Sequence, residues 1–279
     1  MTGPVPPEAD RLYHYTNLTG LLGILKQQRI FASDCRFVND PRELRYGVET
    51  VGIPVFDEFG QTGSDPELVS SYIEGLERFL SPGSAPFLAC FSTEGDQLSQ
   101  WRGYGSESTV VSLGFSASAL SEGLVLWNPG RSLRLLPVIY DEARAKAAFR
   151  EVIPQKDGQL FRIPSGSGNL MATGHMYDVA ITCKHPGFRE ESEWRIIASR
   201  VGLGVPEIDF VDVRLQNGRL VPYIEVALGN EDSPMPLEEI RFFPGADPDG
   251  TVRAGIEAAL SKAGMEHVSV LGSTIPYRP

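Results

Sequence analysis

The distribution of strand-like segments limits the possible folds of this chain more than any other feature of its sequence. Short apolar runs of strand length outnumber the helical segments and do not alternate regularly with them. Regular alternation would predict a parallel, doubly wound sheet, whereas this order is typical of an α+β fold. The predicted strands lie at residues 11–15, 29–32, 86–92, 109–115, 133–140, 193–199, 211–216, 219–226, 240–243 and 268–271.

Helices are predicted where apolar residues recur three and four positions apart. Four leucines between residues 18 and 25 indicate the first helix, which Thr16 or Asn17 can cap. Asn217-Gly218 predicts a tight turn between two antiparallel strands. We therefore expect a mainly antiparallel or mixed sheet with helices at its periphery. The other predicted helices lie at residues 65–80, 94–104, 141–152, 171–183 and 249–263.

The 279 residues contain no internal repeat and no break in composition, so we expect one domain over residues 11–279. Pro-rich residues 1–10 predict a disordered N-terminal tail. Residues 154–169 combine Gly, Ser and Pro with little apolar content, which predicts a mobile loop. No transmembrane stretch and no signal-peptide pattern is recognised. These features predict a cytoplasmic protein without a membrane partner, and they leave the oligomeric state open.

Charge and cysteine content exclude some classes of function. The net charge of −11 disfavours general binding to nucleic-acid backbones but leaves room for a local basic cleft. Three cysteines that lie far apart, without a Cys-x-x-Cys motif, predict buried thiols in a reducing compartment. The pair Cys183 and His185 lacks a complementary second ligand pair, so we expect no metal site.

The first group of candidate site residues is Leu-Tyr-His-Tyr-Thr at positions 12–16. On a strand, His14 and Thr16 share one face, and Tyr13 and Tyr15 lie on the other. A neutral imidazole beside a hydroxyl is suited to binding the two hydroxyls of a ribose. The alternative is a hydrogen-bonded core histidine with Thr16 as a helix cap, and an isolated histidine is more often of that kind.

The second group follows the strand that ends near Ser92. Trp101 and Tyr104 lie three apart, which places them on one face of a short polar helix. Their rings could stack on a flat nitrogen heterocycle, and Arg102 could pair with a phosphate. Anchoring of both aromatic side chains in the core explains the pattern equally well.

The third group is acidic and leads directly into a strand. Glu191 and Glu193 are two apart, so they share a face with Arg195 if the strand begins early enough. Neighbouring carboxylates are costly unless pairing or function holds them in place. The alternative is a solvated, charged entry to a strand.

Taken together, these motifs resemble a bacterial and phage family, domain of unknown function 2971 (DUF2971). The resemblance covers nearly the whole chain, and the family name implies no activity. It rests on residues 12–16, on Asn39-Asp40-Pro41 with Glu43, on Cys90-Phe-Ser with Trp101-x-x-Tyr104, on Lys184-His185-Pro with Glu191-x-Glu193-Trp-Arg, and on Ser273 to Arg278.

The layout more distantly resembles the ADP-ribosyltransferases, which bind NAD in the cleft of a split, mostly antiparallel sheet. This resemblance implies a split sheet, NAD as the substrate, a protein or nucleic-acid acceptor, and a role in a toxin system or in conflict between bacteria and phage. Glu193 would bind the nicotinamide ribose, and Glu191 would orient the acceptor. The NAD-binding residues that it implies are His14, Tyr15, Thr16, Asn39, Ser92, Trp101, Arg102 and Tyr104.

The proposed chemistry suits these residue types. Cleavage of the nicotinamide–ribose bond develops positive charge on the sugar, and a carboxylate in a dry cleft stabilises that charge. Arg42, Arg45 or Arg102 is expected to hold the pyrophosphate.

Two other classes of function fit the same sequence. One is a nucleotide-sensing or partner-binding module without turnover. The other is a different enzyme, either an NAD glycohydrolase or a nuclease that acts through Glu190, Glu191 and Asp40 with a bound metal ion.

Overall fold

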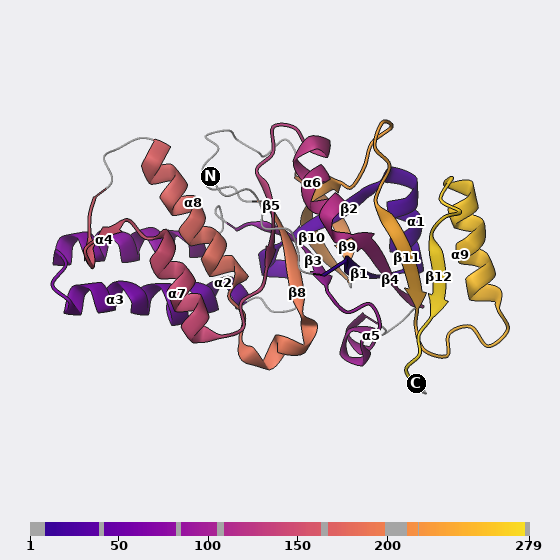
Figure 1. The fold of residues 1–279 in the computed structure, drawn as a ribbon, viewed down its shortest axis with the longest axis horizontal. Helices are drawn as coiled ribbons and strands as arrows, with labels where there is room; N and C mark the ends of the chain where they lie inside the picture. The colour runs from indigo at the N-terminus through magenta and orange to yellow at the C-terminus, as the bar shows by residue number, and fades with distance from the viewer. Residues whose placement is uncertain are drawn as a thin grey trace.

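The computed structural model describes residues 9–38, 42–81, 85–104, 109–162, 167–198, 211–216 and 218–276. It is an α+β fold around a mixed, mostly antiparallel open sheet, as the order of predicted elements indicated (Figure 1). A group of helices lies at one end of the sheet, and α9 lies at the other end. Asn39, one of the predicted site residues, lies outside the described residues.

Ten strands form the main sheet, and β12-β11-β4-β1-β3-β2-β10-β9 is the order along its path. The other two of the ten strands, β5 and β8, lie off this path: β8 pairs with β3 and with β5. Of the strand pairs that the structure describes, only β11 and β12 run parallel. The strands are β1 Arg11–Asn17, β2 Arg29–Asp34, β3 Phe87–Ser92, β4 Val110–Ser116, β5 Leu133–Pro137, β8 Glu193–Ala198, β9 Asp212–Gln216, β10 Arg219–Ala227, β11 Leu237–Phe242 and β12 Ser269–Gly272.

The sheet divides at β3. One edge of this strand pairs with β8 along its whole length. On the other edge, β2 pairs with its beginning, where Ser33 faces Leu88, and β1 pairs only at its end, where Tyr13 faces Ser92. Between these two points β3 pairs with neither β1 nor β2. We call this place the split of the sheet.

Nine α-helices are described, together with a π-helical turn, η2, at Gly47–Gly52 and 3₁₀ segments that include η5 at Pro186–Glu191. Asn17, not Thr16, caps α1, because its side-chain oxygen accepts the N–H of Gly20 at 2.8 Å. The helices are α1 Leu18–Gln27, α2 Glu43–Tyr46, α3 Ile53–Gln61, α4 Pro66–Glu77, α5 Leu98–Tyr104, α6 Ala117–Trp127, α7 Glu142–Val152, α8 Ser167–Thr182 and α9 Thr251–Lys262.

Alternate residues of β1, β3 and β8 project to opposite faces of the sheet. The register shows which side chains belong together, because Tyr13 pairs with Ser92 and Ser92 pairs with Glu193. We call the face that carries these three residues the polar face. The other face carries His14 and Phe91, and we call it the apolar face.

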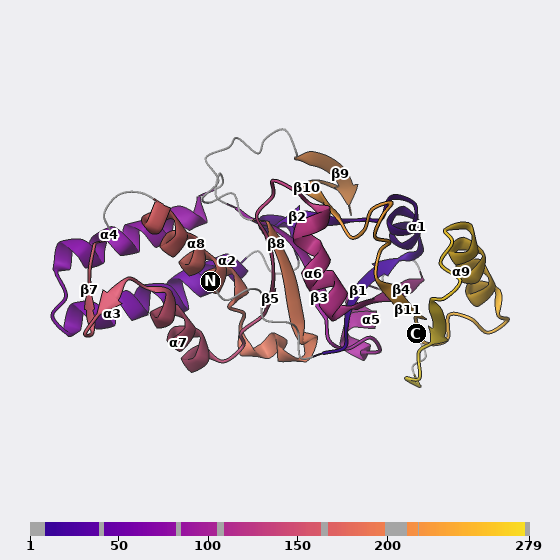
Figure 2. The same ribbon diagram turned by 45° about the horizontal axis from the view of Figure 1, so that its top comes forward.

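Helices cover both faces. On the apolar face, α1, α6 and α9 contribute Leu25, Leu120 and Leu260 to one core. On the polar face, α2, η2, α3, α4, α7 and α8 form a helical lobe whose core reaches Leu88 and Ile197 of the sheet. Figure 2 shows this lobe gathered beside β5 and β8. The short helix α5 covers the part of the polar face that carries Tyr13 and Tyr15.

The helical lobe depends on close contacts that its apolar pattern did not predict. A Cβ atom on Gly47 would lie 1.9 Å from the carbonyl oxygen of Ala180, so only glycine lets η2 cross α8 at this point. The helices between residues 43 and 61 and at residues 117–127 were not predicted from the sequence. Residues 154–169, expected as a loop, contain a short hairpin of β6 Gln155–Lys156 and β7 Gln159–Leu160 and the beginning of α8.

The thiols of Cys35 and Cys183 are buried, as expected, whereas Cys90 is half-buried. None of the described helices has the length and apolar composition needed to cross a bilayer.

Candidate functional site

A buried ion-pair cluster lies on the polar face, where β8 begins. The Glu193 side chain is 5% exposed, and Arg195 is 0% exposed. Arg195 donates from Nε to Glu193 Oε1 at 2.7 Å and from Nη2 to Oε2 at 2.9 Å. Lys184 donates from Nζ to Glu193 Oε2 at 2.9 Å. The carboxylate is therefore held from two sides by positive charge.

Lys184 joins the two predicted catalytic carboxylates. Its Nζ also donates to Glu191 Oε2 at 2.5 Å, and it lies 4.9 Å from the centre of the Phe188 ring. Two cations thus balance two carboxylates, which is the condition under which buried charges are tolerated. Glu190, the third acid of the run, is exposed. Lys184 was not among the predicted site residues, although it belongs to the Lys184-His185-Pro motif of the DUF2971 resemblance.

The backbone around Ser192 brings Glu191 and Glu193 together. β8 begins at Glu193, so Glu191 belongs to η5 and not to the strand. Ser192 adopts the left-handed conformation, with φ of 43°, and turns the chain between them. The Tyr140 hydroxyl accepts the N–H of Glu193 at 2.9 Å and fixes the start of the strand. The two carboxylates therefore meet through Lys184 and not through the strand alternation that we expected.

The pKa of Glu193 is lowered by its partners. Burial alone would raise the pKa, but the charge of Arg195 outweighs this effect, and Lys184 and the Cys90 thiol add to it. Glu193 is therefore ionised at neutral pH inside a dry part of the protein.

Tyr104 is the predicted aromatic residue that remains accessible. Its side chain is 39% exposed, and its ring stacks on Tyr15 with centroids 6.1 Å apart and planes 24° apart. Burial of the hydroxyl raises the pKa of Tyr104, and the charges of Glu193 and Glu191 raise it further. The phenol is therefore neutral and lies within the electrostatic field of the cluster.

Trp101 does not have the role in ligand stacking that we expected. It is 0% exposed, its ring packs edge-on against Tyr15 at 5.0 Å, and its Nε1 donates to Asp96 Oδ1 at 2.8 Å. Tyr15 is also a core residue, since it is 3% exposed and its hydroxyl donates to the Glu94 carbonyl at 2.7 Å. Both side chains support the position of Tyr104.

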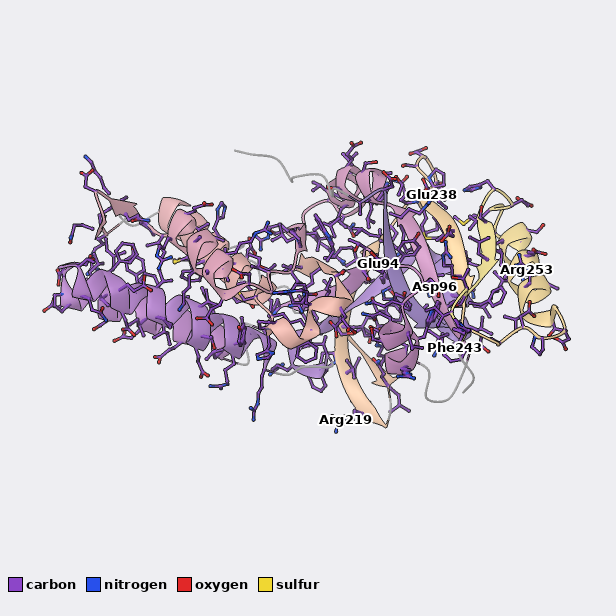
Figure 3. The ribbon with its side chains drawn as sticks, turned by 60° about the horizontal axis from the view of Figure 1, so that its bottom comes forward. Glu94, Asp96, Arg219, Glu238, Phe243 and Arg253 are labelled. Carbon is purple, nitrogen blue, oxygen red and sulfur yellow. The ribbon has the colours of Figure 1, made fainter. Side chains whose placement is uncertain are left out.

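The C-terminal segment is fixed to the same helix. Asp96 accepts from Trp101 at one oxygen, and its other oxygen accepts from the Thr274 backbone N–H at 2.8 Å. Figure 3 shows Asp96 and Phe243 in this part of the molecule, and the Phe243 ring lies 6.2 Å from that of Trp101. The tail that begins at Ser273 in the DUF2971 resemblance therefore helps to position α5.

His14 and Thr16 lie on the apolar face. His14 pairs with Leu113 of β4, which belongs to the apolar core, and it shares this face with Leu12 as predicted. Glu193 projects from the opposite face of the sheet. The single cleft lined by His14, Tyr104 and Glu193 therefore stays a prediction.

The His14 imidazole reaches the backbone of β3 at the split of the sheet, between the pairing points at Leu88 and Ser92. It bonds through Nδ1 to the carbonyl oxygen of Cys90 at 2.9 Å. A carbonyl oxygen can only accept, so Nδ1 carries the proton and Nε2 is left as an acceptor. Nε2 has no hydrogen-bond partner among the described residues. Burial lowers the pKa of His14 to about 4, so the imidazole is neutral at pH 7.

The other predicted site residues have varied surroundings. Ser92 is 2% exposed, and its hydroxyl accepts the N–H of Glu94 at 3.0 Å, which forms a turn after β3. Arg102 is exposed on α5. Arg42 and Arg45 lie on the helical lobe, where they line a shallow hollow of about 310 Å³.

No group of three or more His, Cys, Asp and Glu side chains among the described residues is arranged to hold a metal ion. Asp40, which the nuclease alternative requires, lies outside the described residues.

Comparison with known proteins finds a similarity to one family, and that family has no assigned activity. A family model described as a protein of unknown function, DUF2971, matches residues 100–196, about a third of the chain. No curated protein and no solved structure matches the chain. The matched segment carries Tyr104 and the whole ion-pair cluster, Lys184, Glu191, Glu193 and Arg195. Over residues 100–196 the chain is therefore similar to the DUF2971 family.

Proposed function

We propose that this protein is an NAD-dependent ADP-ribosyltransferase in which Glu193 stabilises the cation that develops on the nicotinamide ribose. One observation supports this function best. An ionised carboxylate, 5% exposed and held by Arg195 and Lys184, acts electrostatically on the hydroxyl of Tyr104, a residue that is 39% exposed. A fixed negative charge in a dry site is what an oxocarbenium-like transition state requires.

The proposed reaction breaks one bond and forms one. The bond between ribose C1′ and the pyridinium nitrogen of NAD breaks, and its electron pair stays on the nitrogen, so nicotinamide leaves as a neutral molecule. A nucleophile of the acceptor attacks C1′ and loses its proton to a base. Glu191 is suited to that role because its side chain is 27% exposed and can be reached from outside.

Tyr104 would position the leaving group. One face of its ring stacks on Tyr15, and the side chain is 39% exposed, so a flat heterocycle can stack on its accessible part. Trp101 supports Tyr104 from within the core.

Binding of a ribose hydroxyl to Glu193 requires a small rearrangement. Arg195 and Lys184 together make three hydrogen bonds to its oxygens, and the Cys90 thiol makes a fourth. A carboxylate offers about four such positions. Lys184 can move toward Glu191 and release one position, while Arg195 keeps the carboxylate oriented.

The acceptor is proposed to be a protein or a nucleic acid, and NAD consumption of this kind would serve a toxin system or phage defence. Labelled NAD incubated with the purified protein and cell extract tests the reaction. The wild type is expected to release nicotinamide and to label a macromolecule. Glu193→Gln should slow both by roughly 100- to 1,000-fold. Glu190→Gln is the matched control, because Glu190 is exposed and should leave both unchanged.

The complete pairing of Glu193 favours a second candidate function, a nucleotide-binding module without turnover. In that case NAD or ADP-ribose raises the melting temperature, since a ligand of the folded state stabilises it, but no nicotinamide is released. Equal labelling by the wild type and by Glu193→Gln would refute the catalytic role of this residue.

A further inference from the structure

Arg214 of β9 differs from the other buried or half-buried arginines of the sheet. Arg134, Arg195 and Arg241 each have a carboxylate oxygen within 2.7 Å. Arg214 has no carboxylate at salt-bridge distance among the described residues, and its buried Nε has no hydrogen-bond partner. Burial of this charge without an acidic partner lowers the pKa of Arg214. An arginine of this kind is costly to the fold unless an anion from outside completes its surroundings.

Neighbouring side chains hold the guanidinium in one place. Its Nη2 donates to the Ser33 hydroxyl at 2.9 Å. Its central carbon lies 5.1 Å from the centre of the Phe31 ring and 5.7 Å from that of Tyr223. Asp212, the nearest acid along β9, accepts from the Tyr223 hydroxyl at 3.1 Å and does not pair with Arg214. The guanidinium is thus fixed by two aromatic rings and a hydroxyl.

Arg214 and Ser33 can both donate hydrogen bonds to a ligand at this position. Ser33 is 8% exposed and uses its oxygen to accept from Arg214, so its hydroxyl proton is available to a ligand. Arg214 supplies further N–H groups in a planar fork, the geometry that matches two oxygens of a phosphate. A donor set with a fixed positive charge selects an anion with several acceptor oxygens.

We propose that Arg214 and Ser33 bind a phosphate group of a nucleotide beside the split of the sheet. Ser33 pairs with Leu88 at the point where β2 leaves β3, and it shares the polar face with Ser92 and Glu193. The positive charge of Arg214 also contributes to the lowered pKa of His14, so the imidazole in the split lies within the field of the guanidinium. The identification of this phosphate with the pyrophosphate of NAD rests on the proposed function; the anion site itself does not.

Isothermal titration of the full-length protein tests the site without reference to turnover. The probes are ADP-ribose, inorganic pyrophosphate and adenosine. The wild type is expected to bind the first two and to bind adenosine more weakly than ADP-ribose. Arg214→Gln should weaken binding of ADP-ribose by roughly 10- to 100-fold, the effect of losing a charged hydrogen-bond partner. Ser33→Ala should also weaken binding of ADP-ribose, but by less. Because this variant keeps Arg214, it still tests the site if Arg214→Gln does not fold.

Arg219→Gln is the matched control, because Arg219 lies at the exposed tip of the same hairpin (Figure 3). It should bind all three probes as the wild type does. Glu193→Gln should keep its affinity for inorganic pyrophosphate, which lacks the ribose that Glu193 is proposed to bind, and this separates the anion site from the proposed chemistry. Binding of pyrophosphate without any gain for ADP-ribose would indicate a site for free anions and overturn the assignment to a nucleotide. Equal affinity of the wild type, Arg214→Gln and Ser33→Ala, or no binding of either phosphate probe, would overturn the proposal.

Discussion

Neighbouring residues of β8 project into two very different surroundings. Ile196 projects into the core of the apolar face, whereas Glu193 and Arg195 form an ion pair on the polar face and are only 5% and 0% exposed. Charges buried in this way cost desolvation energy, and well-packed apolar residues at such places are often equally stable or more stable. Stability alone therefore explains the apolar face but not the cluster. We infer that the cluster is kept for its chemistry.

The largest effect is expected from breaking the ion pair on one side. Arg195→Met should lower the free energy of unfolding by about 3–5 kcal/mol, because it leaves Glu193 buried with less compensating charge. Urea unfolding measures this loss. Ile196→Val, the next residue along but on the apolar face, should cost only about 0.5–1.5 kcal/mol. Similar losses for the two variants would show that the faces do not differ as described.

Replacement of the whole cluster sharpens the comparison. The triple variant Lys184→Met, Glu193→Met and Arg195→Met should recover most of the stability lost in Arg195→Met, because no unpaired buried charge remains. Glu191 loses its partner there, but its side chain is 27% exposed and is solvated. The same variant should release no nicotinamide from NAD. A triple variant as unstable as the single one would contradict the view that the cluster is dispensable for folding.

A smaller effect is expected at Tyr104, where the polar face is accessible. Tyr104→Leu should reduce kcat/KM for NAD by the equivalent of about 0.5–1.5 kcal/mol, the energy of an aromatic stack, whereas Tyr104→Phe keeps the ring. Steady-state kinetics of nicotinamide release distinguishes the two variants. Equal losses would assign the effect to the hydroxyl and not to stacking.

The last prediction is a pH dependence that separates the faces. The pKa of His14 falls from 6.5 to about 4 on folding, so between these values the unfolded chain binds the proton and the folded chain does not. Its contribution to stability is complete above pH 6.5 and is lost as the pH falls toward 4. Glu193, with a pKa below its ordinary 4.5, acts at lower pH: its contribution is lost only as the pH falls below that value.

Urea unfolding across both intervals measures these contributions. His14→Gln should flatten the loss between pH 6.5 and 4, and Glu193→Gln should leave that interval unchanged. An unaltered slope in His14→Gln would mean that this histidine is not held neutral by the fold.

The sequence predicted local geometry well, because a strand has a fixed period of two. It placed His14 with Leu12 and placed Tyr13 with Tyr15, and the register confirms this arrangement. It did not show that Glu193 projects from the opposite face, because that depends on the pairing of Tyr13 with Ser92 and of Ser92 with Glu193. These contacts join segments far apart in the chain and leave no local pattern.

Burial was harder to predict than secondary structure. A tryptophan and a tyrosine three apart on a helix have the same pattern whether they bind a ligand or anchor the helix, and here Trp101 anchors while Tyr104 remains accessible. Lys184 completes the cluster from the end of α8, and only the packing of that helix on the sheet brings it to Glu193. The crossing of η2 and α8 at Gly47 similarly required the assembled lobe.

The most direct test of the account compares one residue from each face of the split sheet in a single assay. Nicotinamide release from NAD is measured at saturation for the wild type, Glu193→Gln and His14→Gln; the glutamine at position 14 keeps an N–H donor for the Cys90 carbonyl. The account predicts that Glu193→Gln lowers kcat by roughly 100- to 1,000-fold and that His14→Gln retains it. An equal loss of kcat in both variants, or a loss in His14→Gln alone, would contradict the assignment of the chemistry to the polar face.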